Sequence, residues 1–229
     1  MNQRIRMLGV WSGILYFLLW GTGLVTFVNG VSPMSGSLDA QTVADFYQER
    51  TVPILIGVVI MTVTATFYLP WTLLLSDLMK AVEAPGYLLS QAQIIGGALS
   101  FLTFWIPPYF WGAAAYRPLR NIELTQALND IGWLIFITGI GPFILQYLSL
   151  AVMIFIDKRE NPPFPRWAGY LQIWISLSFI PAVMPFFMKT GPFSMNGLFV
   201  WWIPLTLFIA WFVMMITLAR KAVLRSATA

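Results

Sequence analysis

The sequence predicts an all-α membrane protein, a bundle of six transmembrane helices in a single domain. Of the 229 residues, 59% are hydrophobic and 10% are charged, whereas soluble domains carry about 25% charged residues. Aromatic residues make up 16% of the chain and include 11 tryptophans, a residue that gathers where membrane helices meet water. We therefore expect a multi-pass protein of a cell membrane.

Six hydrophobic runs are long enough to cross a bilayer, because about 20 apolar residues span its core of about 30 Å. The runs lie at approximately 8–30, 53–76, 87–112, 131–156, 167–188 and 196–219, within one domain over residues 1–229. Arg4 and Arg6 precede the first run as they would in a signal peptide. This run is longer than the apolar region of a signal peptide and no clear cleavage site follows it, so we expect it to remain as the first span.

The distribution of lysine and arginine predicts that both termini are cytoplasmic, because cytoplasmic loops carry an excess of these residues. With the N-terminus inside, nine of the 13 basic residues fall on the inner side: Arg4, Arg6, Lys80, Lys158, Arg159, Arg166, Arg220, Lys221 and Arg225. The outer side holds Arg50, Arg117, Arg120 and Lys189. Orientation accounts for the net charge of +4, so we expect no nucleic-acid partner.

Two loops on the outer side are expected to form short interfacial helices. In residues 31–52, Ser37 can cap a helix that lies along the membrane surface. In residues 114–130, Asn121 can act as N-cap, and Glu123 suits the first turn of the helix that follows. This second helix either lies on the surface first or runs directly into span four.

The chain has no cysteine and no histidine, which excludes several kinds of chemistry. Disulfides, thiol nucleophiles, thiolate metal sites and histidine-bound haem, iron or copper need side chains that are missing. No lysine lies deep in a span, where a retinal Schiff base would need it, and no carboxylate lies there to relay protons. We therefore expect no cofactor and no metal, and no enzyme motif stands out.

Prolines interrupt the last three spans at a similar depth. They are Pro142 in span four, Pro181 and Pro185 in span five, and Pro204 in span six. Pro142, Pro181 and Pro204 stand about 8–12 residues from the outer end, or about 12–18 Å deep. Because proline bends a helix and frees a carbonyl group, Pro142, Pro181 and Pro204 are candidate hinges around a hollow. The alternative is ordinary packing kinks, which are common in membrane helices.

Candidate ligand-binding residues gather around this hollow. A buried amide needs hydrogen-bond partners, so Gln146 in span four should face the bundle interior. The other candidates are Thr64 in span two and three deep tryptophans, Trp20, Trp105 and Trp174. In contrast, Trp111, Trp133 and Trp167 fit interface anchors.

Two arginines at the outer mouth run against the charge bias of the loops. Arg117 and Arg120 either form ion pairs with Glu123 and Asp130, or hold an anionic head group above the hollow. In the second reading, Tyr109 frames the mouth together with these arginines and is a further ligand-binding candidate.

Small residues in two spans predict close helix packing, since glycine lets helix backbones approach each other. They are Gly96 and Gly97 in span three, and Gly21 and Gly23 in span one.

The runs YRPLRNIELTQALNDIGW, PPFPRWAGYLQIW and FFMKTGPFSMNGLFVWW, within residues 116–202, carry a resemblance. Together they resemble a family of uncharacterised bacterial multi-pass membrane proteins. This resemblance implies a bacterial inner membrane and no particular activity.

Three functions are compatible with these features. The leading hypothesis is a non-catalytic protein that binds a lipophilic molecule or acts as an accessory subunit of a membrane complex. The alternative is a facilitative transporter or channel for a small neutral or amphipathic solute. A lipid-modifying enzyme would need an interfacial carboxylate such as Glu123 or Asp130. Expected partners are membrane lipids, a lipophilic molecule, other membrane subunits or a second copy of the chain.

Overall fold

The computed structural model describes residues 2–28, 32–83, 86–117 and 119–225, and within these residues it is helical without strands. In these ranges, six helices are long and apolar enough to cross a membrane. They run Gln3–Phe27, Thr51–Glu83, Leu88–Tyr116, Ile122–Ile156, Arg166–Phe186 and Leu198–Arg225. The predicted all-α fold with six apolar spans is confirmed, and most helices extend beyond the predicted hydrophobic runs into the polar residues at their ends.

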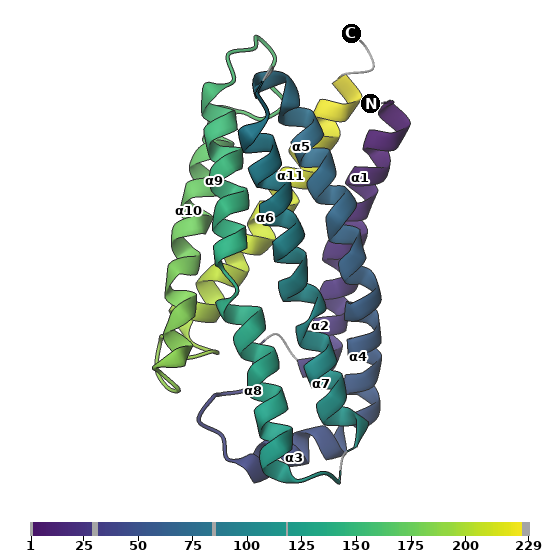
Figure 1. The fold of residues 1–229 in the computed structure, drawn as a ribbon, viewed down its shortest axis with the longest axis vertical. Helices are drawn as coiled ribbons and strands as arrows, with labels where there is room; N and C mark the ends of the chain where they lie inside the picture. The colour runs from purple at the N-terminus through teal and green to yellow at the C-terminus, as the bar shows by residue number, and fades with distance from the viewer. Residues whose placement is uncertain (1, 29–31, 84–85, 118, 226–229) are drawn as a thin grey trace.

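Every span departs from α-helical geometry once, within the described residues (Figure 1). Span one is α1 (Gln3–Leu15), the π-helical η1 (Tyr16–Trp20) and α2 (Gly21–Val28); span two is α4 (Thr51–Thr64), the 3-10 turn η2 (Ala65–Phe67) and α5 (Tyr68–Glu83). Span three joins α6 (Leu88–Trp105) to α7 (Pro107–Tyr116), and span four joins α8 (Ile122–Thr138) to α9 (Gly141–Ile156). Span five ends α10 (Arg166–Phe179) in the 3-10 helix η3 (Ile180–Phe186), and span six begins with the π-helical η4 (Leu198–Trp202) before α11 (Ile203–Arg225).

The short helix α3 (Ala40–Glu49) lies across the end of the bundle, beside the start of α8 (Figure 1). Its N-cap is Asp39, whose carboxylate accepts a hydrogen bond from the Thr42 N–H at 2.7 Å, and this bond lowers the pKa of Asp39. The predicted cap, Ser37, instead hydrogen-bonds to Ser35 at 2.9 Å. Asp39 is in the N-cap position because the helix begins at Ala40, two residues later than Ser37 would require.

A buried polar contact attaches α3 to span four. The Tyr47 hydroxyl, which is fully buried, donates to the side-chain oxygen of Asn129 at 3.1 Å. Beside it, the Arg50 guanidinium donates to the carbonyls of Thr26 and Phe27 at 3.2 and 3.1 Å. Arg50 thus satisfies carbonyls at the end of α2 that have no partner within that helix.

The second segment that we expected on the outer side begins a helix at Ile122, with Asn121 as its N-cap, and this helix continues into span four. Of the two alternatives for residues 114–130, the structure therefore has the direct entry into the span. The Asn121 side chain accepts from the N–H groups of Glu123 and Leu124, as predicted for an N-cap.

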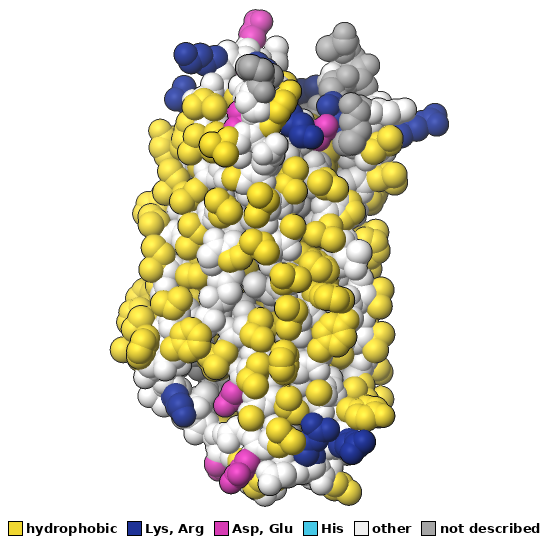
Figure 2. All heavy atoms as spheres, viewed as in Figure 1, with side chains coloured by type: hydrophobic (Ala, Val, Ile, Leu, Met, Phe, Trp, Pro, Cys, Tyr) yellow, Lys and Arg dark blue, Asp and Glu magenta, His cyan; other side chains and the backbone are white. Residues whose placement is uncertain are grey.

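Side-chain carboxylates also fix the opposite end of the bundle, where α1 begins and α11 ends (Figure 1). Arg6 and Asp77 form an ion pair at 2.8 Å that links α1 to α5. Glu83, the last residue of α5, accepts hydrogen bonds from the N–H groups of Leu89 and Ser90 and so caps α6. Figure 2 shows a broad hydrophobic belt between two charged ends, which is the surface expected of a chain surrounded by lipid.

Candidate functional site

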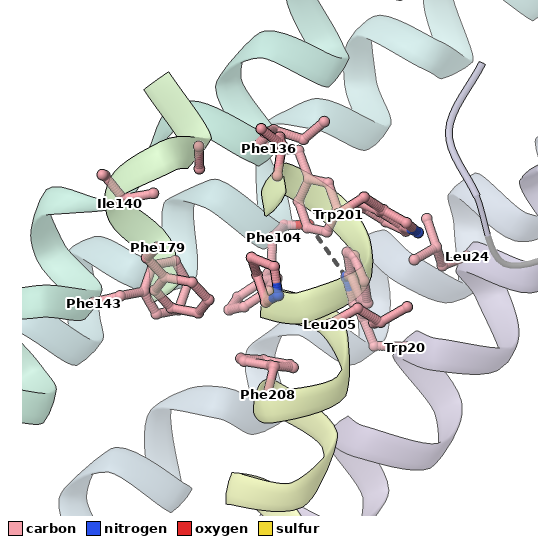
Figure 3. Close-up of a pocket in the computed structure, with 14 residues that line it drawn as sticks. Trp20, Leu24, Phe104, Phe136, Ile140, Phe143, Phe179, Trp201, Leu205 and Phe208 are labelled. Carbon is pink, nitrogen blue, oxygen red and sulfur yellow. Dashed lines mark hydrogen bonds between the residues drawn. The ribbon is translucent and has the colours of Figure 1, made fainter. Parts of the chain in front are cut away.

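A cavity of about 120 Å³ lies where five of the six spans meet. Figure 3 shows 14 side chains around it, and all are apolar or aromatic. They are Trp20, Leu24, Phe104, Phe136, Ile137, Ile140, Phe143, Phe179, Ala182, Val200, Trp201, Pro204, Leu205 and Phe208. Spans one, three, four, five and six contribute, and span two does not.

The helix interruptions supply several of these lining residues. Trp20 ends the π-helical η1, Trp201 lies in the π-helical η4, and Ile140 lies in the break between α8 and α9. Ala182 lies in the 3-10 helix η3. A π-turn or a break redirects side chains and separates backbones that a regular helix would keep in register. The cavity therefore occupies the level at which four of the spans lose α-helical geometry.

Aromatic contacts give the cavity a rigid wall (Figure 3). The Trp20 indole N–H donates to the Phe104 carbonyl at 3.2 Å, and the two rings meet edge to face with centroids 5.2 Å apart. Phe104 also meets Phe143 edge to face with centroids 5.3 Å apart, and it packs in a tilted arrangement against Phe208 with centroids 6.0 Å apart. Such arrangements hold aromatic side chains in fixed orientations.

A polar layer lies on the side of Phe104 and Phe143 that faces the chain termini. The Tyr68 hydroxyl donates to Gln146 Oε1 at 2.7 Å, and Gln146 Nε2 donates to the Thr72 hydroxyl at 3.4 Å. All three side chains are buried. Gln146 therefore faces the bundle interior as predicted, but its amide bonds within this layer and does not line the cavity.

Unpartnered polar atoms surround this layer among the described residues. The hydroxyls of Tyr16, Tyr147 and Ser100 are buried without a hydrogen-bond partner, as are both amide atoms of Gln93. Tyr16 packs against Tyr68 and Phe104 with ring centroids 5.0 and 5.2 Å away. Polar groups in this condition usually bind ordered water.

The structure separates the predicted ligand-binding residues. Trp20 lines the cavity, whereas Trp174 is 66% exposed on the outer surface of α10 and Trp105 stacks on Phe101 with centroids 5.5 Å apart. The Thr64 hydroxyl donates to the carbonyl of Ile60 in its own helix. The direction in which each helix turns its side chains decides which of these residues reach the cavity.

The predicted hinge prolines all lie at or beside the cavity. Pro204 lines it directly, and Pro181 immediately precedes the lining residue Ala182. Pro142 is the second residue of α9, just after the break at Gly139 and Ile140. Their role as hinges stays a prediction.

The residues expected at the mouth form a different feature. Tyr109 and Arg120 line a shallow groove on the outside of the bundle, between α4 and α7. Arg117 is exposed and does not line it. Within the described part of the chain, neither arginine forms an ion pair with Glu123 or Asp130. The predicted ion pairs are therefore absent from this part of the structure. Asp130 instead accepts a hydrogen bond from Asn129 at 3.2 Å.

Two predicted interface anchors are core residues. Trp111 and Trp133 are fully buried, and their rings lie 4.8 Å apart in a cluster with Phe27. The prediction that they anchor the protein at the membrane interface is wrong, because α3 and the neighbouring spans cover both side chains. Trp167 is 56% exposed, as an anchor would be.

Sequence reasoning missed two buried amides and most of the cavity wall. Gln93 and Gln172 are fully buried, and Gln172 Oε1 accepts from the Trp211 indole at 2.7 Å. The argument applied to Gln146, that an amide within an apolar span must face inward, would have found both. Phenylalanines such as Phe136 and Phe208 carry no such signal, because they suit lipid as well as a core.

No group of three or more Asp and Glu side chains that could hold a metal ion occurs in the described ranges. No protein-family model, no curated protein and no solved structure matches the chain.

Proposed function

We propose that this integral membrane protein binds a small lipophilic molecule, without catalysis, in the aromatic cavity. The observation that supports the proposal is the cavity itself: about 120 Å³ of space with a wholly apolar and aromatic lining. Apolar cavities of similar size stay dry and accept molecules as large as benzene. The ligand class is therefore a small aromatic or aliphatic hydrocarbon, or the end of a longer lipophile.

Dispersion contacts would drive binding, since a ligand that leaves lipid gains little from the hydrophobic effect. A ligand that fills the cavity would gain such contacts with the aromatic rings that line it.

Filling the cavity from its own wall tests the proposal. Ala182 lines the cavity and is 3% exposed, so Ala182→Phe should occupy the space. With fluorobenzene as probe, 19F NMR of the wild-type protein in nanodiscs should show a bound signal that Ala182→Phe abolishes. Ala210→Phe is the matched control, because Ala210 is exposed on α11 and should leave the signal unchanged. An undiminished signal from Ala182→Phe would show that the probe binds elsewhere.

Facilitated passage of a small neutral solute is the second candidate. It is favoured by the interruption of every described span, because broken helices that line a cavity are typical of transporters. The two functions differ in flux. Proteoliposomes that take up a small neutral solute faster than empty vesicles, with Ala182→Phe blocking uptake, would favour the transporter. Probe binding without uptake would favour the binding protein, alone or as an accessory subunit.

We also propose that both termini face the cytoplasm of a bacterium whose inner membrane holds the protein. The ends of the six spans place nine basic residues at the terminal end of the bundle and four at the opposite end, as the positive-inside rule requires. The chain lacks cysteine, so single substitutions report sidedness directly. In intact spheroplasts, a membrane-impermeant maleimide should label Ser37→Cys, whereas Asn161→Cys should react only after permeabilisation. The reverse pattern would invert the topology.

A further inference from the structure

The groove between α4 and α7 is separate from the cavity and opens on the outside of the bundle. Its lining is Leu55, Val58, Val59, Thr62, Val63, Tyr109, Gly112, Ala113, Tyr116 and Arg120. Gly112 and Ala113 make it hollow, because two small residues of α7 face the larger side chains of α4. A Cβ atom on Gly112 would lie 3.0 Å from Val58 Cγ1, so this contact forms the floor.

The groove runs along the bundle axis. Its lining extends from Leu55 to Val63 on α4 and from Tyr116 to Tyr109 on α7, because these two helices run antiparallel. Eight residues of helix rise about 12 Å, and one leaflet of a bilayer core is about 15 Å deep. The groove therefore matches the depth of one leaflet, with Arg120 at the end nearest α3.

Arg120 is the one charged side chain among the described residues that line the groove. It is half-buried, and its guanidinium has no hydrogen bond and no ion pair among the described residues. Glu123, three residues further along the chain, is exposed and does not pair with it. A partly desolvated arginine at the head-group level attracts an anion, and its planar fork fits a phosphate.

We infer that the groove binds one phospholipid with a net negative head group. An acyl chain lies between α4 and α7 over Gly112 and Ala113, and the Arg120 guanidinium bonds to the lipid phosphate. An anionic lipid is preferred to a zwitterionic one because phosphatidylcholine already carries a cation beside its phosphate. This site does not depend on the proposed ligand of the aromatic cavity.

Native mass spectrometry of the full chain in detergent, titrated with phosphatidylglycerol or phosphatidylcholine, tests the inference. The wild-type protein should retain one phosphatidylglycerol in preference to phosphatidylcholine. Arg120→Gln should weaken phosphatidylglycerol binding about tenfold, equivalent to about 1.4 kcal/mol, and leave phosphatidylcholine unaffected. Ala113→Leu, which fills the groove, should weaken both lipids. Arg117→Gln is the matched control: it removes an exposed arginine from the same loop and should change neither.

Two results would overturn the inference. In the first, Arg120→Gln and Ala113→Leu both bind phosphatidylglycerol as the wild-type protein does, although their melting temperatures show that they fold. In the second, Ala113→Leu dissociates a dimer while lipid binding is unchanged, which would assign the groove to a second copy of the chain.

Discussion

Replacing Gln146 with alanine is expected to destabilise the protein by about 2–4 kcal/mol. Gln146 is fully buried and holds Tyr68 of α5 at 2.7 Å while it donates to Thr72. The substitution removes both hydrogen bonds and leaves a void between α5, α6 and α9. The change is measured by heating the protein in detergent and using size-exclusion chromatography to quantify the fraction that stays folded at each temperature.

The void should dominate this loss. Hydrogen bonds between membrane helices contribute about 0.6 kcal/mol on average, whereas truncating a large core side chain costs about 2–5 kcal/mol. Gln146→Leu, which keeps most of the volume, should therefore cost only about 1 kcal/mol. Gln91→Ala is the matched control, since Gln91 is an exposed amide on α6 and should be nearly neutral. Equal losses from Gln146→Leu and Gln146→Ala would mean that the hydrogen bonds dominate instead.

Composition and charge were sufficient to predict the six spans. A run of about 20 apolar residues has few structural options other than a transmembrane helix, because every backbone polar group must be satisfied within the segment. The same reasoning predicted that Gln146 points inward and that Asn121 caps a helix. These predictions rest on polar groups, whose solvation cost differs sharply between lipid, protein core and water.

Apolar residues carry no comparable signal in a membrane protein. A helix that is hydrophobic all round does not reveal which face meets lipid. Trp174 and Trp20 are both deep tryptophans, yet the first is 66% exposed and the second 6% exposed. Trp133 is buried because α3 and its neighbours cover it. Its position along span four does not reveal this cover, since the covering helices come from other parts of the chain.

The helix interruptions were predictable in part. Gly139, Pro142 and Pro181 lie at or next to breaks in spans four and five, as expected of helix-breaking residues. Pro204 likewise lies two residues after the π-helical η4, and it removes the N–H group that would bond to the Val200 carbonyl of η4. In contrast, the π-helical η1 contains neither glycine nor proline. Its side chains pack against other spans, as Tyr16 does against Tyr68 of span two, and that information is tertiary.

Gly96→Ala is expected to lower the melting temperature, although alanine is the better helix former. A Cβ atom on Gly96 would lie 2.8 Å from both the Gln146 nitrogen and the Pro142 oxygen, which are backbone atoms of α9. Neither can move without shifting the helix, so α6 and α9 must separate. Overpacking of this kind costs about 1–3 kcal/mol, or about 2–12 °C for a chain of this size.

Gly21→Ala is the matched control. The prediction of close packing at Gly21 is wrong, because a Cβ atom at this span residue would meet no atom within 4 Å. Here the gain in helix propensity, up to about 1 kcal/mol, has no steric term to offset it, so the melting temperature should stay the same or rise. If Gly96→Ala lowers the melting temperature and Gly21→Ala raises it, the need for glycine at position 96 comes from the contact between α6 and α9. It would then not come from the backbone conformation of glycine. Equal and small effects would mean that α6 and α9 lie further apart than this contact requires.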